Sequence, residues 1–177
     1  PFLFMEDKLL IKQEAQALDL KTQKEIFKGW VVECTFFDFL FKALGFEDLN
    51  KVHRDLCEFM ERQWLFKLIL MPRYSFKSSI CTIGYSLRRL AKDHNLRVLI
   101  YSDASNKAEG FLSSIKGHIE GNVAKSLFKS VFDWLPKDRN AKWNQSQITI
   151  ADRTTQYPEP SIDTGGEGTS FVGRHYD

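Results

Sequence analysis

Lys77 and Ser78 are the residues whose types and spacing most directly suggest chemistry. They stand between an apolar run of strand length and the start of an amphipathic helical pattern. At such a junction, backbone N–H groups of a helix N-terminus can hold phosphate, a lysine neutralises phosphate charge, and the hydroxyl that follows ligates Mg²⁺. We therefore expect a phosphate-binding loop made of Pro72, Arg73, Tyr74, Ser75, Phe76, Lys77, Ser78 and Ser79.

Two positions in this loop depart from the usual phosphate-loop pattern. That pattern has glycine six residues and one residue before the lysine, because glycine permits positive φ and a close approach of the backbone to phosphate. Here those positions hold Met71 and Phe76. On spacing alone, a charged helix start with solvated side chains, in which Ser78 is the N-cap, explains the stretch equally well.

The elements that must position the loop read as alternating strands and helices. The apolar run at residues 64–71 predicts a buried parallel strand, and residues 78–94 predict a helix. A second buried strand is expected at 96–102, followed by a helix over 105–119 that Gly121 ends. This order predicts an α/β fold with right-handed crossovers.

The flanking sequence predicts helices before these elements and short strands after them. Residues 1–62 predict helices at 6–18, 22–30, 33–44 and 49–62, the second capped by a Thr22–Glu25 capping box. Beyond Gly121 we expect one more helix at 123–134, short strands at 147–151 and 160–164, and a glycine-rich loop over 164–177. The chain thus divides into a helical N-terminal subdomain, 1–62, and an α/β region, 63–177, which carries the candidate phosphate-binding loop.

Composition excludes several classes of protein. The 177 residues are 43% hydrophobic, which excludes a disordered tail. The 25 Lys and Arg residues nearly balance the 23 Asp and Glu residues, so the net charge of +2 does not by itself suggest nucleic-acid binding. Three cysteines without a CxxC pair argue against a disulfide framework or a zinc site and favour a reducing cytosol. No apolar run approaches the ~20 residues that a membrane helix needs.

The loop and its surroundings resemble the large subunit of tailed-phage DNA-packaging terminases. In that family the ATPase loop often reads Pro-Arg, three variable residues, then Lys-Ser or Lys-Thr, as residues 72–78 do here, and its glycines are sometimes replaced. Residues 96–106 look like the second strand and its loop, and residues 143–150 look like the β segment after the basic-tryptophan element. Residues 169–177 are similar to the run that enters the Walker B strand. The resemblance covers residues 53–177.

The resemblance implies a P-loop NTPase-like parallel sheet flanked by helices, with ATP and Mg²⁺ as cofactors. Lys77 would bind phosphate, Ser78 would ligate Mg²⁺, and Arg73 would contact the γ-phosphate or couple hydrolysis to movement. Tyr74, Ser75 and Phe76 would contribute backbone N–H groups. The Walker B carboxylates would follow Asp177. Residues 63–177 would therefore be the N-terminal part of a P-loop ATPase domain, which is incomplete and would have little ATPase activity of its own.

The full-length protein would be an ATPase that drives dsDNA into a procapsid in the cytoplasm of the bacterial host. Its partners would be dsDNA, a portal protein, a small terminase subunit and other copies of itself in a ring, with no membrane. Two alternatives remain: another P-loop helicase or translocase, and a non-catalytic assembly module with a degenerate nucleotide loop.

Three other sets of residues are weaker candidates. Asp103 follows the second strand, where α/β sites gather, or is a helix cap. A second set consists of basic residues with tryptophans among them, which could contact a DNA backbone or could simply lie on solvated surfaces: Lys125, Lys129, Lys137, Arg139 and Lys142, with Trp134 and Trp143. The histidines share no metal spacing, so we interpret them as structural or surface residues: His53, His94, His118 and His175.

Overall fold

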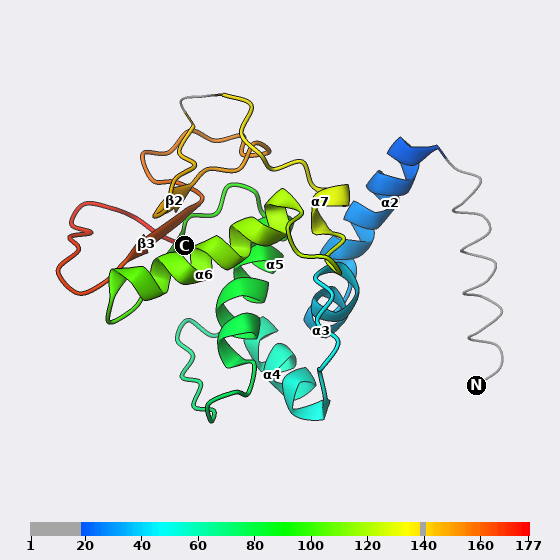
Figure 1. Cartoon of the computed structure of the whole chain (residues 1–177), viewed down its shortest axis with the longest axis horizontal. Coiled ribbons are helices and arrows are strands. Elements are labelled where there is room, and N and C mark those ends of the chain that lie inside the picture. Colours follow the sequence, from blue (N-terminus) through cyan, green and yellow to red (C-terminus); the bar gives the residue numbers. More distant parts are fainter. Residues whose placement is uncertain (1–18, 139–140) are drawn as a thin grey trace.

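The computed structural model describes residues 19–138 and 141–177. In these residues a small three-stranded sheet is flanked by helices, which makes a mixed α/β structure (Figure 1). One cluster of buried apolar side chains extends from Val31 in the N-terminal helices to Ile162 in the sheet. Early and late parts of the sequence therefore share a core. The helix expected at 6–18 lies outside the described residues.

The first helix, α2 (Leu20–Glu33), begins earlier than the sequence suggested. Asp19 is its N-cap, and its carboxylate accepts hydrogen bonds from the backbone N–H of Lys21 at 2.9 Å and of Thr22 at 3.2 Å. Thr22 therefore lies inside the helix, where its hydroxyl donates to Asp19. The predicted Thr22–Glu25 capping box is wrong, because an aspartate three residues earlier caps the helix instead.

The next predicted helix, 33–44, is broken at Cys34, which has an extended backbone. Thr35 caps a short α3 (Phe36–Asp38), which continues as the π-helical η1 (Phe39–Ala43). The fourth predicted helix is present as α4 (Lys51–Glu61), capped by Asn50. The N-terminal part of the described chain is thus helical, as expected, with different boundaries.

The helical region after the candidate loop consists of the π-helical η2 (Ser79–Gly84) and α5 (Tyr85–Lys92). Arg88 of α5 is only 2% exposed and donates to the carbonyl oxygens of Val31 and Cys34. It therefore satisfies carbonyls at the C-terminal end of α2 that have no helical partner. The predicted helix at 78–94 is confirmed in type, although its first half is π-helical.

The middle of the chain follows the sequence closely. Strand β1 (Val98–Tyr101) and helix α6 (Ser105–Glu120) lie where they were predicted. Gly121 ends α6 with a left-handed φ of 83°, a conformation that glycine adopts without steric cost. Helix α6 packs against β1 and β3, and Figure 1 shows it lying across the sheet.

The helix expected at 123–134 is mostly wrong, because only α7 (Phe128–Val131) forms. The chain before it is held by a backbone hydrogen bond of 2.9 Å from Leu127 to the carbonyl of Ala43. The chain after it turns inward, where Phe132 and Trp134 are buried and both pack on Phe128. Burial of these aromatic rings therefore outweighs continuation of the helix.

The sheet consists of β1, β2 (Gln147–Ile148) and β3 (Ile162–Gly165), in the order β1-β3-β2. Strands β1 and β3 are parallel, with Val98 opposite Ile162, whereas β2 is antiparallel to β3. Both late strands were predicted near their observed positions. The sheet is mixed, so the prediction of a parallel sheet holds for the β1–β3 pair alone.

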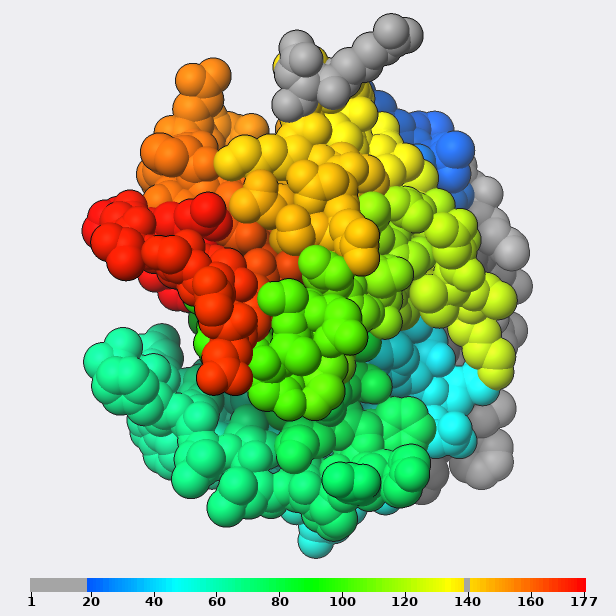
Figure 2. All heavy atoms as spheres, turned by 60° about the vertical axis from the view of Figure 1, so that its left-hand side comes forward, coloured from blue at the N-terminus to red at the C-terminus, as the bar shows by residue number. Residues whose placement is uncertain are grey.

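The predicted strand at 64–71 is wrong. No backbone-to-backbone hydrogen bond joins residues 65–71 to any other described residue, so the segment belongs to no sheet. Its side chains at Leu65, Phe66, Leu68 and Leu70 are 78–89% exposed. Figure 2 shows this part of the chain, in teal and green, standing across a hollow from the red C-terminal segment. Apolar composition predicted a strand, but a strand also needs a neighbour to pair with.

Candidate functional site

Residues 71–79 form a loop that curls around a hollow of about 440 Å³. Helical structure begins at Lys77, and the first helical hydrogen bond runs from the N–H of Ile80 to the carbonyl of Phe76 at 2.9 Å. Lys77, Ser78 and Ser79 therefore form a first turn, whose N–H groups have no acceptor within the helix. The eight residues predicted for the site are gathered around this one hollow, at the N-terminal end of a helix.

Two residues of the loop have left-handed backbone conformations that are unusual for residues with side chains. Tyr74 has φ of 63° and Phe76 has φ of 52°. Among the described residues they are the only non-glycine residues with positive φ. Phe76 is one of the two positions where the usual pattern has glycine, so the backbone takes a glycine-like conformation there although the side chain is large.

The side chain of Lys77 folds back over the loop. Its Nζ lies 3.4 Å from the carbonyl oxygen of Met71, and Ser75 Oγ donates to the carbonyl of Pro72 at 2.7 Å. No carboxylate of the described residues forms an ion pair with Lys77. The lysine charge is therefore not neutralised by a neighbour and is available to an anion.

Ser78 and Arg73 are both exposed. Ser78 is the N-cap residue of η2, but its side chain makes no capping hydrogen bond. Its hydroxyl is at the helix start, where a metal ligand of a phosphate loop is expected. The guanidinium of Arg73 makes no ion pair or hydrogen bond to the other described residues.

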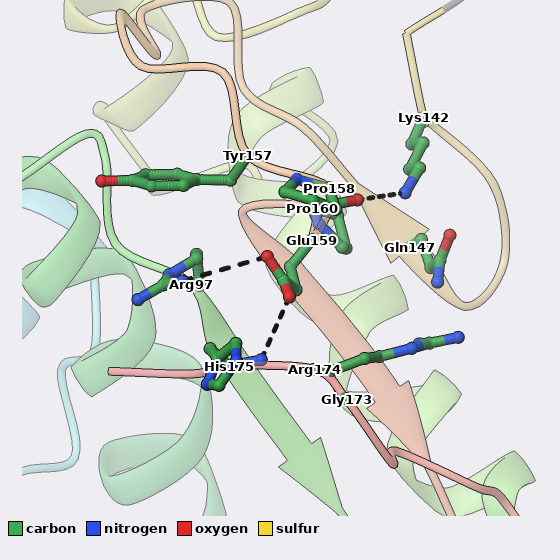
Figure 3. Close-up of a pocket in the computed structure, with 10 residues that line it drawn as sticks. All are labelled: Arg97, Lys142, Gln147, Tyr157, Pro158, Glu159, Pro160, Gly173, Arg174 and His175. Carbon is green, nitrogen blue, oxygen red and sulfur yellow. Dashed lines mark hydrogen bonds and ion pairs between the residues drawn. The ribbon is translucent and has the colours of Figure 1, made fainter.

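A second hollow, of about 540 Å³, lies beside the start of β1 and carries more charge (Figure 3). Ion pairs at and beside this hollow join five residues that we call the C-terminal ion cluster: Arg97, Glu159, Asp163, Arg174 and Asp177. In it, two guanidinium groups face three carboxylates, and Arg97 binds both oxygens of Asp177 at 2.9 and 3.0 Å. Lys142 and Glu159 also line this hollow, and both arginines are already hydrogen-bonded to carboxylates.

Asp163 is the most deeply buried member of this cluster, at 1% exposed. It accepts hydrogen bonds from Arg174 at 2.6 Å, from the Tyr176 hydroxyl at 2.8 Å and from Gln147 at 3.1 Å. Glu159 accepts from the backbone N–H of His175 at 3.0 Å, which lowers the pKa of that carboxyl. The charges of the cluster thus bind the C-terminal segment to the sheet.

Asp103 lies at the end of β1, as predicted, but not in the candidate loop. It is exposed and accepts hydrogen bonds from Lys107 at 2.6 Å and Ser102 at 2.8 Å, which together lower its pKa to about 2. Because Ala104 is the N-cap of α6, the alternative of a side-chain helix cap is also wrong. Asp103 is therefore the partner of a surface ion pair.

The basic positions considered for DNA have neighbours of their own. Lys125 pairs with Glu47, Lys129 with Asp133, and Lys142 Nζ donates to a backbone carbonyl at 2.8 Å. Arg139 lies outside the described residues. These contacts agree with solvated surface pairs, and they leave DNA binding at this face untested.

The four histidines divide by burial. His53 and His118 are buried, and burial lowers the pKa of His118 to about 4. The rings of His94 and Trp134 are in contact, and His175 lines the hollow beside the C-terminal ion cluster. In the described part of the chain, no three His, Cys, Asp or Glu side chains gather to hold a metal ion.

His53 contacts the candidate loop, which its position in the sequence did not indicate. Its ring lies against that of Phe76, with the centroids 5.8 Å apart. The available signal was the spacing Asn50-x-x-His53, in which an N-cap and the third helical residue exchange hydrogen bonds. That spacing fixes the histidine ring at the start of α4, although it does not reveal what the ring contacts.

Comparison of the chain with known proteins finds no matching family model, no matching curated protein and no matching solved structure. In the described residues, no helix is both long enough and apolar enough to cross a bilayer.

Proposed function

We propose that this protein binds ATP with Mg²⁺ through residues 71–79, as the ATP-binding part of a phage DNA-packaging motor. The observation that carries the proposal is the left-handed backbone at Phe76, directly before Lys77 and the start of a helix. A strained conformation at this one position is costly for a phenylalanine and is typical of functional loops. It supports the proposal because glycine, which adopts positive φ freely, is the usual residue directly before the lysine of a phosphate loop.

In this proposal each part of the loop has its own task. The first-turn N–H groups of Lys77, Ser78 and Ser79 point toward a bound phosphate and are helped by the helix dipole. The Lys77 ammonium replaces its weak contact with the Met71 carbonyl by a contact with phosphate oxygens. Ser78 would hold Mg²⁺, which supplies charge neutralisation between the phosphates.

Arg73 would act on the γ-phosphate. Its exposed guanidinium lies at the rim of the same hollow and has no acidic partner in the described residues. A guanidinium suits this task because its fixed fork can bind two phosphate oxygens at once. Arg73 would therefore distinguish ATP from ADP, whereas Lys77 would bind both.

Hydrolysis needs a carboxylate to orient the attacking water, and residues 71–79 contain none. The resemblance implies that this group lies on a strand beyond Asp177. The position of Asp177 supports this part of the proposal, because this residue contacts the edge of β1 that faces away from β3. The Asp177 N–H donates to the Arg97 carbonyl there at 3.0 Å, so Asp177 lies beside this edge of the sheet.

The wider function is proposed on the resemblance. As a terminase large subunit, the protein would couple ATP hydrolysis to movement of dsDNA into a procapsid in the bacterial cytoplasm. It would work with a portal protein, a small subunit and further copies of itself. The other candidate function is an assembly module that binds no nucleotide, which the bulky residues Met71 and Phe76 favour. Another P-loop helicase or translocase would use the same loop.

The test is a titration of the chain with a fluorescent ATP analogue in the presence of Mg²⁺. We expect saturable binding, and a loss of at least about 30-fold in affinity in Lys77→Ala, because a charge-assisted contact to phosphate disappears. Lys28→Ala is the matched control, since Lys28 is a surface lysine of α2 paired with Glu25. It should bind as the wild type does.

Each outcome separates the candidates. Binding that Lys77→Ala removes and Lys28→Ala leaves intact supports a nucleotide-binding motor part. Absence of binding in the wild type favours the assembly module. Equal binding by all three proteins would mean that the nucleotide lies elsewhere, and it would overturn the assignment of residues 71–79.

A further inference from the structure

Phe76 holds a backbone conformation that it would not adopt unaided. A left-handed φ costs a residue with a side chain roughly 1–2 kcal/mol relative to ordinary conformations. Such a conformation persists where the surroundings fix it. The two left-handed residues of the loop differ in this respect. Tyr74 is 99% exposed, whereas Phe76 is 42% exposed and lies against another ring.

That ring belongs to His53, which is 23 residues earlier in the sequence, in the first turn of α4. The two ring planes meet at 83° with centroids 5.8 Å apart, an edge-to-face arrangement. Such pairs contribute about 0.5–1.5 kcal/mol beyond their buried area. This is comparable to the cost of the left-handed φ at Phe76, so the contact can decide whether that conformation is populated.

His53 is itself firmly held. It is 6% exposed, and its Nδ1 accepts a hydrogen bond from the N–H of Asn50 at 3.0 Å. The Asn50 side chain in turn accepts from Val52 and His53, which completes a capping box. Leu56, Cys57 and Met60 anchor α4 in the hydrophobic core. The ring therefore gives Phe76 a fixed surface rather than a mobile one.

We propose that His53 is a positioning residue of the 71–79 loop, which holds Phe76 in its left-handed conformation and so sets the course of the backbone into Lys77. The consequence for nucleotide affinity rests on the proposed function, whereas the effect on the loop does not. Through this contact, the N-terminal helices influence the shape of the loop although their sequence contains no phosphate-binding motif.

The experiment compares His53→Ala with His53→Phe. Both variants lose the Nδ1 acceptor of the capping box, but only His53→Ala loses the ring, so their difference isolates the contact with Phe76. We expect His53→Ala to weaken binding of the ATP analogue about fivefold and His53→Phe to recover most of it. In a chain that also carries Phe76→Gly, His53→Ala should change affinity less than about twofold, since glycine adopts positive φ without help.

A second readout needs no nucleotide. NMR backbone chemical shifts of residues 75–78 report whether φ at Phe76 is positive. His53→Ala should move these shifts toward an ordinary right-handed or extended conformation, and His53→Phe should leave them nearly unchanged. Thermal unfolding shows whether each variant is folded.

The two proposals fail in different ways. If the wild type binds no nucleotide but His53→Ala still changes the shifts, the proposed function is wrong and the positioning role stands. If His53→Ala leaves the shifts of folded protein unchanged, the positioning role is overturned. An equal loss of affinity in His53→Ala with and without Phe76→Gly would overturn it as well, because the effect would not pass through Phe76.

Discussion

The 71–79 loop and the C-terminal ion cluster each have two cationic side chains next to a hollow, but the surroundings of these cations differ. In the loop, Lys77 contacts one backbone carbonyl and Arg73 is solvated. In the cluster, Arg97 and Arg174 are each hydrogen-bonded to a carboxylate. Cations already paired hold structure together, whereas unpaired cations at a helix N-terminus can bind a ligand.

The two regions also differ in where strain lies. Of the residues that the structure describes, the two non-glycine residues with positive φ both lie in the loop, and the cluster contains none. The cluster gains its order from hydrogen bonds between residues far apart in sequence, such as Arg97 and Asp177. The larger hollow and the greater number of charges therefore mark the structural region, and the strained backbone marks the candidate site.

The largest expected effect separates the regions by stability. Asp163→Ala should lower the free energy of unfolding by about 3 kcal/mol, because it removes a buried acceptor and leaves the donors around it unpaired. Urea denaturation measures this loss. Asp103→Ala is the control: that carboxylate is exposed and its removal should change stability little. Similar losses in both variants would contradict the view that burial gives the cluster its structural role.

A smaller effect should reveal the strain in the loop. Tyr74 is 99% exposed at φ of 63°, so its substitution changes backbone strain with almost no loss of packing. Tyr74→Gly should stabilise the protein by up to about 1 kcal/mol, and Tyr74→Val should destabilise it by about 1 kcal/mol, since β-branched residues tolerate positive φ least. The sign of the difference in thermal unfolding is decisive. If both variants are less stable than the wild type, the loop is not strained at this position.

The smallest effect concerns pH. Hydrogen bonds from Arg97 hold the pKa of Asp177 below its usual 3.8, so this carboxylate stabilises the fold above that value. Its contribution is lost as pH falls through the lower folded-state pKa. Asp177→Asn should therefore cost less than about 1 kcal/mol near pH 6 and nothing near pH 2. A cost that stays constant over this range, measured by denaturation at each pH, would show that the charge is not involved.

Local patterns predicted a large part of this structure. Helix α6 and its end at Gly121 were found from apolar periodicity and from one glycine, because both signals act within a few residues. Strand β1 was found for a similar reason. The wrong predictions lie at positions whose secondary structure depends on residues that are distant in the sequence. The apolar run at 64–71 has no neighbouring strand, and the predicted helix at 123–134 gives way to burial of Phe132 and Trp134.

The candidate loop shows the same division. The sequence by itself determined that Lys77 and Ser78 stand at the start of a helix, because helix periodicity and residue type are local properties. Only the tertiary structure decided that the bulky Phe76 takes a left-handed conformation, which glycine adopts more readily, against the ring of His53. It also decided that Arg97 and Arg174 are paired with carboxylates, whereas the cations of the loop are not. The physical reason is that pairing and ring contacts depend on residues brought together by folding, which spacing along the chain does not encode.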